Sequence, residues 1–369
     1  MMTGTVMGVT NAKEQSALDR AQEVRQFEDS KLGVKGLLDS GVKSLPPLFI
    51  HPPDILPTAK PVGSKPKSIP TIDLFGFDSN RRSLVVKEVA SAAREFGFFQ
   101  IVNHGVPPEV LDRTIKAMKA FHEQPTEAKA KIYRRESETG VAFFSNIDLL
   151  HSKAASWRDT LLIRSGPKLA DLEEIPEVCR NEVIEWNQQI QWLGGLLMGL
   201  LSEGLGLSPS KLQDITCLEK RNMAGQYYPC CPQPDLTIGI ASHTDPGVIT
   251  VLLQDHIGGL QVKHGDEWVD VTPIPGALIV NIGDLLQIMS NDEYKSVDHR
   301  VLANASPESR MSVAVFYYPS DCESLFGPFP ELVSPEKPAI YQQFKVGEYL
   351  KTFYTNELDR KSLKNHFKA

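Results

Sequence analysis

The sequence predicts an α+β fold in which helices come first and a β core follows. From Arg221 to Tyr318, about eight short apolar segments alternate with turns rich in Gly and Pro, which is typical of a β-sandwich or a jelly roll. Before Arg221 the periodicity is mainly helical, and one more helix is expected near the C-terminus. A hydrophobic fraction of 41% and a charged fraction of 23% are those of a globular protein with ample material for a core.

The N-terminal half is expected to begin irregularly and then to become helical. Residues 1–15 are small and polar, so we expect disorder there, and an amphipathic helix is predicted from Asp19 to Leu38. Eight prolines between Pro46 and Pro70 indicate an extended arm. The other predictions are strands over 69–74 and 98–102, helices over 83–96, 107–124, 126–133 and 176–205, and strands and loops with exposed aromatic side chains over 143–160.

The second half is expected to supply the β core. Eight strands are predicted there, over 223–228, 236–242, 248–254, 260–263, 268–271, 277–282, 297–302 and 311–318. A helix over 346–358 follows. These elements suggest an N-terminal extension with a helix and the Pro-rich arm (1–66), a mixed α/β region packed on the core (67–215), the β core (216–325) and a C-terminal helical segment (326–369).

Composition and charge exclude several classes of function. The formal net charge is −7 and no basic block occurs, so we expect no nucleic-acid partner. No basic flank precedes an apolar run at the N-terminus, and the nearly uncharged stretch 186–202 is too short and too polar for a membrane span. Five cysteines, an odd number without Cys-x-x-Cys spacing, indicate reduced thiols. We expect a cytoplasmic monomer that acts on a small-molecule substrate.

The main candidate site is His243-Thr244-Asp245, at the end of the predicted strand 236–242. In an extended chain, side chains two positions apart point to one face, so His243 and Asp245 can meet one metal ion while Thr244 turns away. One more His would complete a triad of two imidazoles and one carboxylate, which leaves coordination positions open and suits non-haem Fe(II). The spacing alone is weak evidence, because nine His and 46 acidic residues give roughly one such pair by chance.

A second pair with the same spacing has a different setting. His264-Gly265-Asp266 lies between two predicted strands, where Gly-Asp is typical of a hairpin turn in solvent, so a metal there would lack walls. His256 is also expected in a loop, and His104, at a strand-to-helix turn, is expected to make structural hydrogen bonds. His299 instead lies in an alternating strand pattern that is not adjacent to the first pair. We therefore predict His299 as the third ligand.

Arg310-Met311-Ser312 follows eleven residues after His299. The same two-residue spacing on a strand sends the Arg310 guanidinium and the Ser312 hydroxyl to one face. Arginine beside a hydroxyl commonly binds a buried carboxylate with charge-assisted hydrogen bonds. A metal face with a carboxylate clamp on a neighbouring strand describes a site for an acid that chelates the metal.

Taken together, these motifs resemble the plant Fe(II)/2-oxoglutarate-dependent dioxygenases from about residue 20 onward, most closely the branch called 1-aminocyclopropane-1-carboxylate oxidase homologues, which includes hydroxylases of alkaloids and benzoxazinoids. The matching stretches are Phe96-Gly-Phe-Phe-Gln-Ile-Val-Asn-His-Gly105, Trp157-Arg-Asp159, Tyr227-Tyr-Pro-Cys-Cys-Pro-Gln-Pro234, His243-Thr-Asp245, Val280-Asn-Ile-Gly-Asp284, Ser296-Val-Asp-His-Arg300 and Arg310-Met-Ser312.

The resemblance implies a distorted double-stranded β-helix (jelly roll) core at 216–325, flanked by helices. It also implies that His243, Asp245 and His299 hold Fe(II), and that 2-oxoglutarate chelates the iron with its far carboxylate on Arg310 and Ser312. Tyr228 matches the second Tyr of the family's Asn-Tyr-Tyr-Pro pattern, which helps to hold 2-oxoglutarate. Gln226 departs from the Asn of that pattern, so its role as a co-substrate or substrate contact stays open.

The implied reaction consumes 2-oxoglutarate and O2, releases succinate and CO2 and hydroxylates a small plant specialised metabolite of alkaloid, benzoxazinoid or phenolic type, with ascorbate as the expected reductant. Desaturation, ring closure or O-demethylation are alternative outcomes. A non-catalytic small-acid-binding protein, an ethylene-forming oxidase that uses ascorbate without 2-oxoglutarate, and a zinc hydrolase are further alternatives. Candidate walls of the substrate pocket are Phe143, Phe144, Gln226, Phe316 and Tyr318.

Overall fold

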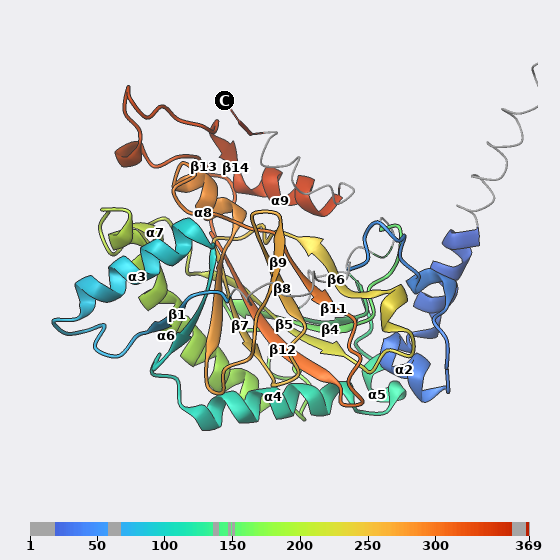
Figure 1. The fold of residues 1–369 in the computed structure, drawn as a ribbon. Coiled ribbons are helices and arrows are strands. Elements are labelled where there is room, and N and C mark those ends of the chain that lie inside the picture. Colours follow the sequence, from blue (N-terminus) through green and yellow to red (C-terminus); the bar gives the residue numbers. More distant parts are fainter. Residues whose placement is uncertain are drawn as a thin grey trace, which may run out of the picture.

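Two β-sheets form the centre of the molecule, and helices surround them (Figure 1). The computed structural model describes residues 19–57, 68–135, 140–146, 149, 152–355 and 367–368. Helices dominate the first half of the chain and strands the second half, as the sequence predicts. The predicted α+β fold class is therefore confirmed.

The larger sheet has eight strands in the order β1-β2-β10-β7-β12-β5-β4-β3, and only the β1–β2 pair is parallel. The strands β12 and β5 pair in continuous register over nine residues each, which keeps alternate side chains on opposite faces along their whole length. The bounds are β1 Thr71–Asp73, β2 Phe98–Val102, β3 Val141–Phe144, β4 Asp159–Gly166, β5 Lys220–Tyr228, β7 Ile249–Gln254, β10 Leu278–Ile282 and β12 Arg310–Tyr318.

The smaller sheet has the order β6-β11-β8-β9 and carries both His-x-Asp pairs. Its strands are β6 Ile238–His243, β11 His299–Leu302, β8 Leu260–His264 and β9 Glu267–Asp270. All eight strands predicted for the second half are present in the two sheets. The structure adds the short pair β13 Leu325–Phe326 and β14 Phe344–Lys345. Strands and loops are predicted over 143–160, and the structure has β3 and β4 at the two ends of this segment.

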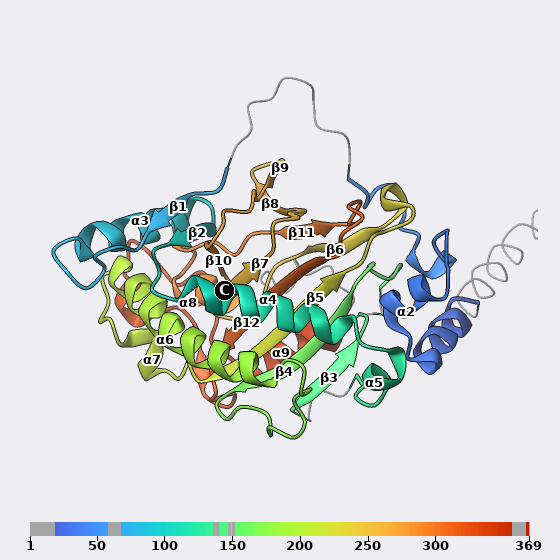
Figure 2. The same cartoon turned by 90° about the horizontal axis from the view of Figure 1, so that it is seen from below.

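Three long helices cover one face of the larger sheet (Figure 2). They are α3 Arg82–Glu95, α4 Pro108–His122 and α6 Arg180–Gly204. In β3, β4, β5, β7 and β12 the apolar side chains at odd positions, such as Leu161, Met223 and Val313, are buried with these helices in one core. The even positions point to the opposite face, where the larger sheet approaches the smaller one.

The remaining helices are short and lie around this core. Besides the two helices of the N-terminal extension, they are η1 Pro47–Phe49, α5 Thr126–Ala130, α7 Lys211–Asp214, η2 Pro234–Leu236, α8 Asp284–Met289, η3 Pro330–Leu332 and α9 Val346–Thr355. Within the described ranges, no helix combines the length and apolarity needed to cross a bilayer. The predicted C-terminal helix is thus present as α9, and its predicted last residues, 356–358, lie outside the described part of the chain.

The single helix predicted from Asp19 to Leu38 is wrong, because the chain forms two helices, over 19–30 and over Gly33–Asp39 (α2). The break has a tertiary cause. Asp159 accepts hydrogen bonds from the backbone N–H groups of Val34 and Lys35 at 2.8 and 2.9 Å, at the start of α2. Gly33 has φ +66°, and a Cβ there would lie 2.8 Å from the Asp159 carboxylate. Sequence periodicity contains no information about this distant carboxylate.

The prediction of exposed aromatic side chains over 143–160 is also wrong. Phe143, Phe144 and Trp157 are all buried. Trp157 is buried because the Pro-rich arm packs on it, with the ring of Phe49 edge-on against Trp157 and centroids 5.0 Å apart. Phe143 is buried instead against Phe121 of α4. The predicted disorder at 1–15 and the arm residues 58–67 lie outside the described residues.

Candidate active site

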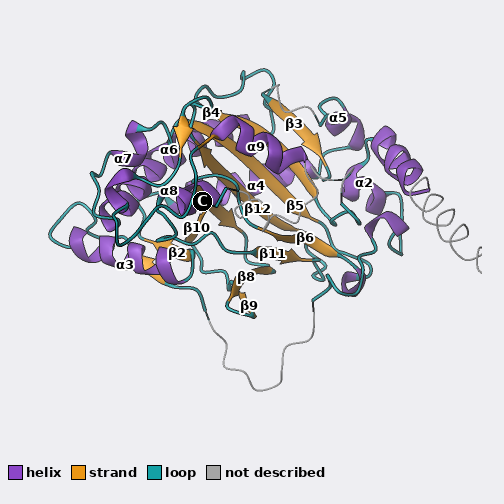
Figure 3. Ribbon diagram, turned by 90° about the horizontal axis from the view of Figure 1, so that it is seen from above, coloured by secondary structure: helices purple, strands orange, loops and turns teal. Residues whose placement is uncertain are grey.

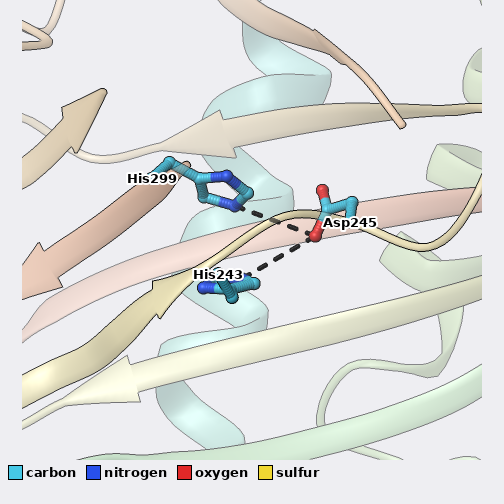
Figure 4. Close-up of side chains that lie close together, drawn as sticks. All are labelled: His243, Asp245 and His299. Carbon is cyan, nitrogen blue, oxygen red and sulfur yellow. Dashed lines mark ion pairs between the residues drawn. The ribbon is translucent and has the colours of Figure 1, made fainter. Parts of the chain in front are cut away.

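Three potential metal ligands from two adjacent strands meet at one point (Figure 4). His243 ends β6, Asp245 follows two residues later, and His299 begins β11 directly opposite His243 in the β6–β11 register. The Nε2 atom of each imidazole lies 3.7 Å from Asp245 Oδ1. In the described part of the chain, this is the only group of three or more His, Cys, Asp or Glu side chains with ligand atoms close enough to hold a metal ion.

Backbone carbonyls orient both imidazole rings. His243 Nδ1 lies 2.8 Å from the Ala241 carbonyl, and His299 Nδ1 lies 3.4 Å from the Val297 carbonyl. A carbonyl can only accept a hydrogen bond, so each Nδ1 carries the proton and donates it. Each Nε2 lies on the side of Asp245 Oδ1, where its lone pair can bind a metal. Metal-binding histidines in proteins typically have this tautomer and this support.

The Asp245 carboxylate divides its two oxygens between the protein and the imidazoles. Oδ2 accepts hydrogen bonds from Thr250 Oγ1 at 2.6 Å and from Asn281 Nδ2 at 2.8 Å, whereas Oδ1 faces the two histidines. Thr244 points away, and its hydroxyl donates to Asp284 at 3.0 Å. Two imidazole nitrogens and one carboxylate oxygen on one side of a cavity fit a divalent metal with open positions, such as Fe(II).

A buried guanidinium lies on the neighbouring strand β12. Arg310 is 1% exposed, and it donates to Ser312 Oγ and to Gln254 Oε1, each at 3.0 Å. Its Nε atom and the Gln254 Nε2 atom find no hydrogen-bond acceptor among the described residues. Buried donors without acceptors are costly, so this group fits an anionic ligand such as a carboxylate of 2-oxoglutarate.

Tyr228 completes this polar group from the adjacent strand β5. Its ring packs against the Arg310 guanidinium, 4.8 Å from the ring centroid, and it faces Arg310 in the strand register. Burial raises the pKa of the Tyr228 phenol above its usual value, although Arg310 and Arg158 act in the opposite direction. The phenol therefore stays protonated at neutral pH and can donate a hydrogen bond.

A cavity of about 1470 Å³ lies between the two sheets and contains all of these groups. Even-numbered side chains of β4, β5 and β12 form its floor, including Leu162, Ala224 and Ala314. The helix α9 lies across the end of this floor (Figure 3) and contributes Leu350 and Phe353 to the wall. The volume exceeds that of a typical small-molecule pocket, which leaves space for a substrate beside a co-substrate.

Four of the five residues predicted as pocket walls line this cavity, namely Phe144, Gln226, Phe316 and Tyr318. Phe143 does not. It precedes Phe144 on β3 and therefore points to the opposite face, where it packs edge-on against Phe121 in the helix-covered core. Predicting both neighbours as walls of one pocket conflicts with the alternation of side chains along a strand.

Gln226 holds a second buried arginine. Its Oε1 atom accepts hydrogen bonds from Arg158 Nη1 and from Thr160 Oγ1, each at 2.8 Å. Sequence reasoning did not identify Arg158, Thr160 or Gln254 as site residues. A signal existed for Arg158 and Thr160, because they alternate with Asp159, but it required β4 to be recognised as a strand.

The other histidines lie where the sequence places them. His264-Gly265-Asp266 spans the β8–β9 turn, Gly265 has φ +60°, and the His264 ring stacks on Phe96 with centroids 4.2 Å apart. His104 accepts a hydrogen bond from the Val106 amide and lies 2.9 Å from the Gly276 carbonyl. Burial lowers the pKa of His104, so it is a neutral structural residue.

Comparison with known proteins places this site in a family. Residues 69–182 match the family model described as non-haem dioxygenase in morphine synthesis N-terminal, and residues 220–319 match the 2OG-Fe(II) oxygenase superfamily. The chain is 46% identical over 353 residues to 1-aminocyclopropane-1-carboxylate oxidase homolog 4 of Arabidopsis thaliana, covering 95% of this chain and 99% of that protein. It is 42% identical over 363 residues to a homolog from Solanum lycopersicum, covering 96% and 98%.

Similar solved structures support the same family. A crystal structure of JOX2 in complex with 2OG, Fe and JA superimposes with a TM-score of 0.80 at 33% identity, covering 91% of this chain and 97% of that chain. The rice dioxygenase for auxin oxidation superimposes with a TM-score of 0.69 at 26% identity, covering 82% and 100%. These matches confirm the jelly-roll prediction. The chain belongs to the 2OG-Fe(II) oxygenase superfamily, among relatives named plant 1-aminocyclopropane-1-carboxylate oxidase homologs, and is a dioxygenase that depends on Fe(II) and 2-oxoglutarate.

Proposed function

We propose that this dioxygenase hydroxylates a small plant specialised metabolite of alkaloid, benzoxazinoid or phenolic type, using O2 and 2-oxoglutarate and releasing succinate and CO2. The observation that carries the proposal is the layout of one cavity. Three ligand atoms converge on one side, a buried arginine lies beside the unsatisfied amide nitrogen of Gln254, and the floor includes apolar side chains such as Leu162, Ala224 and Ala314.

We assign His243, Asp245 and His299 as the ligands of Fe(II), and Arg310, Ser312 and Tyr228 as the contacts of the far carboxylate of 2-oxoglutarate. Bound Fe(II) supplies the redox chemistry by which one oxygen atom of O2 enters succinate and the other enters the substrate. The protein's own contribution is to fix the position of each partner. The carbonyl contacts of His243 and His299 and the two donors to Asp245 Oδ2 hold the ligand face rigid.

The walls of the cavity would determine which C–H bond is oxidised. Phe144, Phe316 and Tyr318 supply aromatic surface near small side chains such as Ala224. Burial holds the pKa of the Tyr318 phenol well above its usual value, so this side chain is a neutral hydrogen-bond donor in the wall. Gln226 has a position from which it can contact the substrate or the co-substrate.

The sequence alternatives of desaturation, ring closure and O-demethylation need the same iron site and differ only in how the substrate lies. A non-catalytic acid-binding role is disfavoured by the complete ligand set with its supporting hydrogen bonds. We further propose ascorbate as reductant and a monomeric protein. The five thiols are free, which supports a reducing compartment such as the cytoplasm.

The test is incubation of the protein with Fe(II), ascorbate, 2-oxoglutarate and a plant metabolite extract under air. We expect succinate release and one or more ions that gain an oxygen atom. An ion that loses two hydrogens instead would identify desaturation or ring closure. His243→Ala serves as the matched control, and product formation that is equal in this variant and in the wild type contradicts the proposal.

A further inference from the structure

Arg158 is a buried cation that forms no ion pair with any residue of the described part of the chain. It is 9% exposed and immediately precedes β4, where Trp157 N donates to the Ile238 carbonyl at 2.8 Å and so joins β4 to the strand β6. One guanidinium nitrogen, Nη1, donates to Gln226 Oε1. The Nε atom has no acceptor among the described residues, and no carboxylate of that part of the chain pairs with Arg158.

The neighbouring carboxylate, Asp159, does not neutralise Arg158. Asp159 is the next residue on the strand, and its carboxylate points to the opposite face, where it binds the amides of Val34 and Lys35 and the hydroxyl of Ser145. Burial raises the pKa of the Asp159 carboxyl, and the hydrogen bonds from Lys35, Ser145 and Val34 act in the opposite direction. Tyr228, on the adjacent strand, is a neutral phenol.

Neither the iron nor 2-oxoglutarate would supply the missing negative charge. Fe(II), the Asp245 carboxylate, the two carboxylates of 2-oxoglutarate and the Arg310 guanidinium together carry no net charge. With that group complete, Arg158 is still an uncompensated cation in the same cavity. A buried charge is stable only when it is paired and hydrogen-bonded, so a further anion is expected at this point.

The cavity as a whole also has an excess of positively charged side chains. Among the described residues, seven Lys or Arg and two Asp line it, although the chain carries a net charge of −7. Of these two acids, Asp245 faces the histidines and Asp54 is exposed. Among the cations, Arg310 and Arg158 are buried, whereas Lys153 is exposed and Arg164 is half-buried. Solvent can screen the latter two, but it cannot screen Arg158.

We propose that Arg158 binds a carboxylate of the primary substrate, which is therefore an organic acid. This inference rests on the proposed function and narrows it, because a cationic alkaloid would be repelled by Arg158, whereas a phenolic or other acid would be attracted. The planar guanidinium suits a carboxylate, and Arg158 lines the cavity with only its Nη1 atom in a hydrogen bond to another described side chain.

Gln226 is the positioning residue for this contact. Its Oε1 atom fixes Arg158 Nη1 and also accepts from Thr160, so the amide is held from two sides. This leaves the amide nitrogen of Gln226, which lines the cavity, as a further donor next to the guanidinium. The departure from the family's Asn at this position thus has a structural consequence, since the longer side chain supports the arginine.

The experiment uses the full chain loaded with Mn(II) in place of Fe(II) and saturated with 2-oxoglutarate, so that turnover is absent and Arg310 is engaged. Phenylacetate, cyclohexylacetate and indoleacetate are titrated by calorimetry beside their methyl esters. We expect at least one acid to bind about tenfold more tightly than its ester, the ratio that one charge-assisted hydrogen-bonded pair typically gives. Arg158→Gln should remove this preference, and Arg158→Lys should keep part of it.

Arg164→Gln is the matched control, because Arg164 lines the same cavity from the same strand, is half-buried, and has no ion-pair partner in the described ranges. This variant should keep the preference. The inference is overturned if no acid binds more tightly than its ester in the wild type, if Arg158→Gln retains the preference, or if Arg164→Gln loses it. Failure of 2-oxoglutarate itself to bind would instead refute the proposed function, and the inference with it.

Discussion

The two His-x-Asp pairs of this chain share one spacing, yet they have opposite surroundings. His243 and Asp245 end a strand that lies beside His299 and face a cavity between two sheets. His264 and Asp266 flank a glycine at the tip of a two-stranded turn, and Asp266 is exposed. In the first pair each side chain has a supporting hydrogen bond from the protein, whereas in the second pair the His264 ring stacks on Phe96 and neither side chain has a hydrogen bond to the described residues. A short motif becomes a site through what the fold brings to it.

The largest expected contrast comes from removing each pair in turn. His243→Ala or Asp245→Ala should abolish 2-oxoglutarate turnover and lower metal affinity by at least about 100-fold, because two ligands remain where three are needed. His264→Ala and Asp266→Ala should leave both quantities unchanged. The measurements are succinate release and calorimetric titration with Mn(II). Loss of turnover in Asp266→Ala, or full turnover in Asp245→Ala, would reverse the assignment of the two pairs.

A second contrast concerns the carboxylate clamp, which lies near the first pair only. Arg310→Ala should raise the 2-oxoglutarate concentration for half-maximal turnover by about 10- to 100-fold, since it removes a charge-assisted contact and leaves Gln254 without its partner. Metal affinity should stay within about twofold of the wild type. Arg310→Lys keeps the positive charge but lacks the paired N–H groups of the guanidinium, so an intermediate 2-oxoglutarate requirement is expected. An unchanged requirement for 2-oxoglutarate would place the clamp elsewhere.

Much of the fold and the centre of the site could be predicted, because both depend on local periodicity. Alternation along strands identifies the eight core strands, and spacing on strands joins His243 to Asp245 and Arg310 to Ser312. The roles of these residues stay predictions, but the structure brings them into one cavity. The register between strands was not accessible from the sequence. For that reason the two donors to Asp245 could not be predicted. The error at Phe143 has another cause, because alternation along β3 already excludes Phe143 and Phe144 from one face.

Contacts between distant segments explain the other errors. The helix break before Gly33 depends on Asp159, 126 positions later in the chain. Burial of Trp157 depends on the Pro-rich arm. The sequence shows Arg158 only as part of the stretch Trp157-Arg-Asp159. Its role as a proposed anion contact follows from the absence of a carboxylate partner around it in the described structure. A missing partner is visible only after all neighbours have been placed.

A smaller effect is expected from the groups that hold Asp245. Asn281→Ala removes one of the two donors to Asp245 Oδ2, and Thr250→Val removes the other. Each should weaken metal binding by about tenfold, as is typical when a supporting hydrogen bond to a ligand is lost. Thr250→Ser keeps a hydroxyl and should retain the wild-type affinity. Equal affinity in Thr250→Val and Thr250→Ser would show that Asp245 is held by other means.

The smallest expected effect lies at the second pair. Gly265 has φ +60°, and a Cβ added there would meet nothing within 4 Å. Gly265→Ala should therefore cost only the strain of a left-handed backbone, about 1 kcal/mol in the free energy of unfolding measured with urea. Gly265→Asn should cost less, because Asn tolerates this conformation. Turnover should be unchanged in both variants, since the turn contributes to stability alone. A loss of metal affinity in Gly265→Ala would show that the two pairs are coupled.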